Sequence, residues 1–84
     1  MEANLEDFKT GWFGLQVGLK AQEIDQIIDL LKQVKNRELD HFHARSDFND
    51  PREGIGDIEF YLAGNDAKHN LSLDETQPID PSPS

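Results

Sequence analysis

The spacing of apolar residues changes abruptly near residue 20, and this change limits the possible folds more than any other feature. From Phe13 to Leu19 every second residue is apolar, which is typical of a strand with one apolar face. From Ala21 to Lys35 the spacing becomes helical. The members of the helical stripe are Ile24, Ile27, Ile28, Leu31 and Val34. The pattern predicts a strand followed by an amphipathic helix.

The ends of this helix are marked unequally. Acidic residues in its first turn and lysines in its last turn complement the helix dipole. Asn36 is expected to take the left-handed conformation that ends a helix. At the start, Lys20 stands where a Ser, Thr or Asp side chain would accept a backbone hydrogen bond, so the N-terminal cap is expected to be poor.

A second strand pair is expected after the helix. Residues 41–46 and 56–62 each alternate between apolar and polar side chains, and a loop containing Pro51 separates them. With Pro51 at the loop centre, the facing pairs are Phe42 with Phe60, Ala44 with Ile58, His43 with Glu59 and Arg45 with Asp57. This register predicts one apolar face for the helix and one face of complementary charged pairs.

These elements define one small α+β domain of βαββ order, a two-layer fold with the helix on a mainly antiparallel sheet. We expect the strand at residues 57–62 to lie at the sheet centre. Residues 1–10 are interpreted as a lead-in, 11–73 as the domain and 74–84 as a disordered acidic tail rich in Pro and Ser. Gly14 and Gly18 share one strand face, which indicates that another part of the chain approaches closely there.

The charge of the chain limits its partners. Seventeen acidic and eight basic residues give a net charge of −9 over 84 residues, which disfavours binding to nucleic acid and anionic membranes and favours a basic protein surface. No apolar run is long enough to span a membrane, and the N-terminus lacks the pattern of a secretory signal. We therefore expect a cytoplasmic protein.

Two histidines and two carboxylates form the most reactive group in the sequence. His41, His43, Asp57 and Glu59 are expected on one face of the second strand pair, where they either pair as charged neighbours or bind a metal ion. The pairing interpretation is favoured because a flat sheet face offers no closed coordination shell. The chain has no Cys, and its serines lack a nucleophile motif, so we expect neither enzymatic activity nor a cofactor.

The order of these segments resembles a group of small bacterial proteins, some of them classed as predicted immunity proteins of polymorphic toxin systems. The resemblance covers residues 11–63 and has four parts: Gly18-Leu19, the helix pattern of residues 23–32, His41-Phe42-His43, and the run Gly54-Ile55-Gly56-Asp57-Ile58-Glu59-Phe60. Lys20 departs from the Ser or Thr usual before such a helix. The resemblance implies a protein that neutralises a cognate toxin by binding it.

The leading hypothesis is therefore an acidic protein-binding module, an immunity-type inhibitor of a basic toxin, acting as a monomer or weak homodimer. Its expected contact residues are His41, His43, Arg45, Arg52, Glu53, Asp57, Glu59 and Tyr61. Two alternatives stay open. One is a metal-binding or metal-dependent protein using His41 and His43, and the other is an acidic mimic encoded by a phage or mobile element.

Overall fold

The computed structural model describes residues 1–49, 54–68 and 70–75, and within them the chain forms four strands and one helix. The elements follow one another as β1 (Glu2–Asp7), β2 (Phe13–Gly18), α1 (Ala21–Lys35), β3 (His41–Arg45) and β4 (Asp57–Tyr61). The α+β class predicted from the sequence is confirmed. The order is ββαββ, however, because residues interpreted as a lead-in form the additional strand β1.

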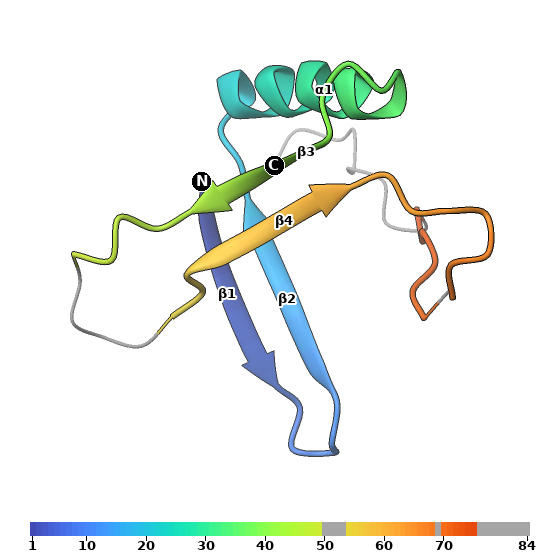
Figure 1. The fold of residues 1–84 in the computed structure, drawn as a ribbon. Helices are drawn as coiled ribbons and strands as arrows, with labels where there is room; N and C mark the ends of the chain where they lie inside the picture. Colours follow the sequence, from blue (N-terminus) through green and yellow to red (C-terminus); the bar gives the residue numbers. More distant parts are fainter. Residues whose placement is uncertain (50–53, 69, 76–84) are drawn as a thin grey trace, which may run out of the picture.

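β1 and β2 form an antiparallel ribbon that points away from the rest of the chain (Figure 1). The turn between them contains Lys9 and Gly11, both with positive φ, and Phe8 N–H donates to the Trp12 carbonyl at 3.1 Å. The sequence concealed β1 because Leu5 and Phe8 are spaced as on a helix and stand among polar residues. The pairing with β2 makes Glu2–Asp7 a strand.

The two faces of this ribbon differ sharply. Leu5 lies opposite Leu15 and Ala3 opposite Val17, so one face is largely apolar. On the other face, a side chain at Gly14 would come within 2.6 Å of the Phe8 ring. The close approach predicted at the glycines is therefore made by residues of β1 and the turn.

Helix α1 has the bounds that its apolar stripe predicts. Its start is stabilised by one of the two hydrogen bonds of a capping box, in which Lys20 N–H donates to the Glu23 carboxylate at 3.0 Å. The other hydrogen bond, from the Glu23 amide to the side chain of residue 20, cannot form because a lysine side chain has no acceptor. At its end, Arg37 rather than Asn36 takes the left-handed conformation, with φ of 60°. The Arg37 and Glu38 amides donate to the carbonyls of Val34 and Gln33, which is a Schellman motif one residue beyond the expected stop.

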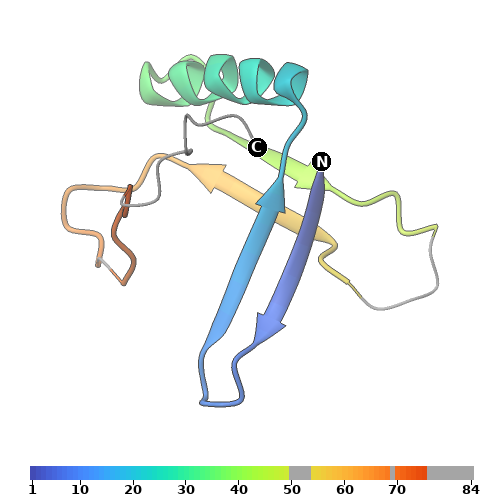
Figure 2. The same ribbon diagram turned by 180° about the vertical axis from the view of Figure 1, so that it is seen from behind.

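β3 and β4 pair in the predicted register, and the helix lies alongside them (Figures 1 and 2). The rings of Phe42 and Phe60 stack with centroids 4.8 Å apart and planes inclined by 15°. Both are half-buried, and Val34 of the helix, 5% exposed, is the only residue classed as buried in the described part of the chain. The small core therefore lies between α1 and the β3–β4 sheet.

The strands do not form one sheet. Among the described residues, β1 pairs only with β2 and β3 only with β4, giving two separate two-stranded sheets. The expectation that the strand at residues 57–62 would be central is wrong, because β4 has a single neighbour. Local alternation predicted β2, β3 and β4, but nothing in the sequence pattern specified that the two strand pairs would stay apart.

The chain after β4 contains no further strand in its described residues 62–68 and 70–75, where Leu71 and Leu73 are 86% and 100% exposed. Most of the predicted disordered tail, residues 76–84, lies outside the described residues. The one helix in the described part is too short and too polar to cross a membrane.

Candidate functional site

The polar face of the β3–β4 sheet, defined by His41, His43, Arg45, Asp57, Glu59 and Tyr61, contains most of the predicted contact residues. Its register sets His43 opposite Glu59 and Arg45 opposite Asp57, as expected. Arg52 and Glu53, also predicted contacts, lie outside the described residues. The structure therefore brings six of the eight predicted side chains onto two adjacent strands.

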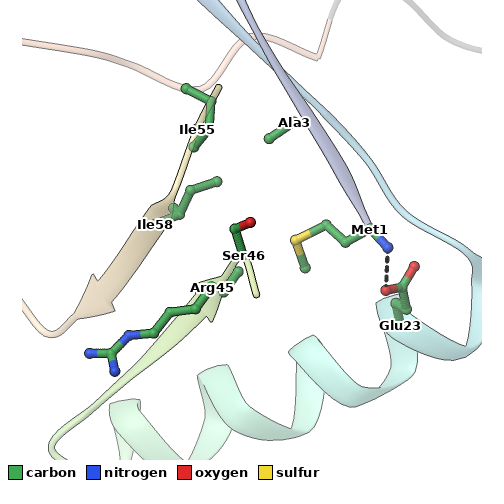
Figure 3. A pocket seen from close by; sticks show the side chains of 8 residues that line it. Met1, Ala3, Glu23, Arg45, Ser46, Ile55 and Ile58 are labelled. Atoms are coloured by element: carbon green, nitrogen blue, oxygen red, sulfur yellow. Dashed lines mark hydrogen bonds and ion pairs between the residues drawn. The ribbon is translucent and has the colours of Figure 1, made fainter. Parts of the chain in front are cut away.

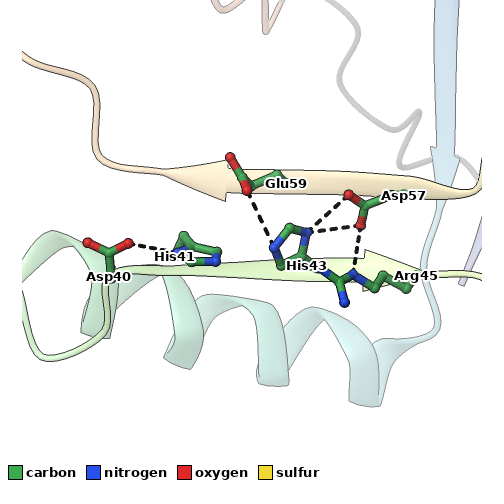
Figure 4. A network of polar contacts seen from close by, with 6 residues as sticks. All are labelled: Asp40, His41, His43, Arg45, Asp57 and Glu59. Atoms are coloured by element: carbon green, nitrogen blue, oxygen red, sulfur yellow. Dashed lines mark hydrogen bonds and ion pairs between the residues drawn. The ribbon is translucent and has the colours of Figure 1, made fainter.

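His43 is the centre of the polar contacts on this face (Figure 4). Its Nδ1 lies 3.0 and 3.1 Å from the two Asp57 carboxylate oxygens, and its Nε2 lies 3.4 Å from Glu59 Oε1. The predicted pair with Glu59 is present, while the contact with Asp57 is a diagonal one that the pairing rule did not indicate. Its side chain is only 20% exposed, so His43 is the least exposed member of this group of charges.

Asp57 is shared between two cationic or hydrogen-bonding partners. Arg45 Nε donates to Asp57 Oδ1 at 3.3 Å, a long contact between side chains that are 63% and 44% exposed. An exposed pair of this kind contributes at most about 1 kcal/mol to stability. Asp57 therefore serves mainly to hold the His43 ring in place.

His41 is positioned by a residue that the sequence analysis did not single out. Its Nδ1 lies 2.7 Å from Asp40 Oδ2, and its ring stands nearly perpendicular to the His43 ring, with centroids 4.9 Å apart. Asp40 directly precedes His41 and β3, so the position of a carboxylate next to a histidine was the sequence feature that could have indicated this contact. Tyr61, opposite His41 in the register, is 65% exposed.

A pocket lies where the ribbon, the start of α1 and the β3–β4 sheet meet (Figure 3). It is an open pocket of about 450 Å³ whose lining includes Met1, Ala3, Glu23, Ala44 and Ile58. The terminal ammonium of Met1 bonds to Glu23 Oε2 at 2.6 Å. This hydrogen bond, with that from the Lys20 amide, lowers the pKa of Glu23 below its ordinary value of 4.5.

The structure thus offers two surfaces of different chemistry, a polar sheet face and an apolar ribbon face. Comparison with protein-family models, with curated proteins and with solved structures found no match to this chain.

Proposed function

We propose that this chain is an acidic protein-binding module, an immunity-type inhibitor that covers the surface of a basic partner protein. One observation supports the proposal above all: the described residues of the chain leave the apolar face of the β1–β2 ribbon largely exposed. Leu5, Phe13 and Leu15 are 60%, 60% and 51% exposed on that face. Contiguous exposed apolar side chains of this size mark protein interaction sites.

The charge of the ribbon indicates the charge of the partner. Asp7 lies on the apolar face, opposite Phe13, and Glu2 and Glu6 lie on the other face of β1, against a single lysine, Lys9, in the following turn. An apolar face on an acidic ribbon suits a partner whose own apolar patch is surrounded by lysine or arginine. A second copy of this chain, also at −9, would bring like charges together.

The polar face of the β3–β4 sheet supplies a second area of contact in this proposal. Tyr61 presents an exposed aromatic ring with a hydroxyl, a combination that is enriched among the residues that dominate binding energy. Binding by shape and charge needs no reaction step, so the proposal assigns no catalytic residue.

The test is co-expression of the full chain with a toxin encoded beside its gene, followed by growth measurement and isolation of the complex. Leu15→Asp places a charge on the apolar face of β2, and we expect it to abolish protection. Gln16→Asp is the matched control, because it adds the same charge on the opposite face of the same strand.

Protection by the native chain and by Gln16→Asp, with loss for Leu15→Asp and a complex of both proteins, would support the proposal. Absence of both protection and complex would end the immunity-type assignment. A homodimer that Leu15→Asp dissociates would show instead that a second copy occupies the ribbon face, which contradicts the assignment of that face to a basic partner.

A further inference from the structure

We propose that His41, His43 and Glu59 form a binding site for a divalent transition metal, with zinc as the metal we commit to. In this site Asp40 and Asp57 orient the two imidazole rings. The inference goes beyond the proposed function, because covering a partner surface requires no metal. It stands on the geometry of the polar face of the β3–β4 sheet.

The three side chains already converge. One ligand atom from each of His41, His43 and Glu59 lies within 4.8 Å of the others. Zinc–nitrogen bonds of about 2.0–2.1 Å in a tetrahedral site set neighbouring ligand atoms about 3.3 Å apart. The separation of His43 Nε2 and Glu59 Oε1, 3.4 Å, meets that requirement. The remaining ligand distances, up to 4.8 Å, have to shorten when the metal binds, and the His41 side chain, 42% exposed, has solvent around it for that adjustment.

Each histidine has the partner that a metal ligand requires. Nδ1 of His41 faces the Asp40 carboxylate and Nδ1 of His43 faces that of Asp57, at 2.7 and 3.0 Å (Figure 4). An ionised carboxylate only accepts hydrogen bonds, so each Nδ1 is the donor and a neutral ring leaves its Nε2 lone pair available. Carboxylate–histidine pairs of this kind fix the tautomer and orientation of metal-binding imidazoles.

The contact between His43 and Glu59 also calls for a positive charge. In the neutral tautomer that Asp57 selects, His43 Nε2 and Glu59 Oε1 are both acceptors, and they face each other at 3.4 Å. Either a proton on Nε2 or a metal ion between the two atoms satisfies this contact, and the proposal assigns a metal ion to it. The surrounding charges favour a cation, since the ion pairs among the described residues set three carboxylates, from Asp40, Asp57 and Glu59, around the two histidines, and Arg45 offsets only that of Asp57.

The ligand types define which metals fit. Two imidazoles and one carboxylate suit zinc, nickel or copper better than magnesium or calcium, which prefer oxygen ligands alone. Because the three ligands lie on an open sheet face, at least one coordination position remains for water or for a group from another molecule.

The test is titration of the full chain with zinc, with affinity read by calorimetry and the site read by the histidine ring NMR signals. We expect His41 and His43 signals to shift with zinc and not with magnesium. His43→Ala and Glu59→Gln should each weaken zinc binding more than tenfold. Asp57→Asn, which removes a positioning group, should weaken it by about 10- to 100-fold.

His69→Ala is the matched control, since it removes the third histidine of the chain and should leave zinc binding unchanged. Circular dichroism of each variant identifies any loss that comes from misfolding, and Glu59→Gln, a nearly isosteric change, keeps the test decisive if His43→Ala unfolds. Unchanged His41 and His43 signals at millimolar zinc would overturn the site. Equal loss of binding in His69→Ala would also overturn it, because the binding would then be unspecific.

Discussion

Each of the two strand pairs has one largely apolar face, yet within the described residues only one of these faces is covered. Phe42 and Phe60 of the β3–β4 sheet stack on each other and are half-buried beside α1. Leu5 and Phe13 of the β1–β2 ribbon are each 60% exposed. An amphipathic strand pair therefore indicates an apolar surface that is to be buried. Whether the same chain or a partner buries it depends on how the other elements pack.

The largest expected effect separates the two pairs directly. Phe60→Ala should lower the free energy of unfolding by about 2 kcal/mol, below the full cost of a buried phenylalanine because its ring is only half-buried. Phe13→Ala should change it by no more than about 0.5 kcal/mol, as for other exposed side chains. Urea denaturation of both variants measures the contrast, and equal losses would show that the ribbon is as well packed as the sheet.

A smaller effect concerns the turn that joins the helix to the covered sheet. Arg37→Gly should stabilise the chain by about 0.5–1 kcal/mol, because Arg37 has a φ of 60° that glycine adopts without strain. Asn36→Gly should destabilise it by a similar amount, since Asn36 has a φ of −86°. Thermal unfolding of the pair checks the assignment. A stabilising Asn36→Gly would contradict the position of the Schellman motif.

The smallest expected effect lies where the ribbon meets the helix, at Glu23. Its folded pKa is lowered first by the Met1 ammonium and then by the Lys20 amide, so its contribution to stability is present above pH 4.5 and is lost as the pH falls through the lower folded value. Glu23→Gln keeps an acceptor for the Lys20 amide but removes the charge. We expect the free energy of unfolding of this variant to fall less than that of the native chain as the pH is lowered into the acid range. An equal fall in the two proteins would show that the ion pair does not hold in solution.

The sequence predicted those parts of the molecule whose pattern is local. Helix α1 and the β3–β4 register follow from apolar spacing alone, and the His43–Glu59 pair followed from that register. β1 was missed because its two apolar side chains, Ala3 and Leu5, stand among charged ones, and its partner is identified only by pairing. The site was incomplete for a related reason, since the contact of Asp57 with His43 is diagonal across the strands.

No local sequence pattern indicated that the two strand pairs would form separate sheets. Whether four strands form one sheet or two depends on which edges meet in three dimensions, and the ribbon pairs with neither β3 nor β4. In the described part of the chain, this separation leaves the apolar face of the ribbon largely exposed, and the proposed function depends on that exposure. The central claim is therefore that this face is exposed in the isolated chain.

The most direct measurement is the mass of the isolated chain at micromolar concentration, combined with hydrogen exchange of its strand amides. The account predicts a monomer of 9.6 kDa in which amides of β1 and β2 exchange faster than those of β3 and β4. A mass twice that value, with the ribbon amides protected as strongly as those of the β3–β4 sheet, would contradict it.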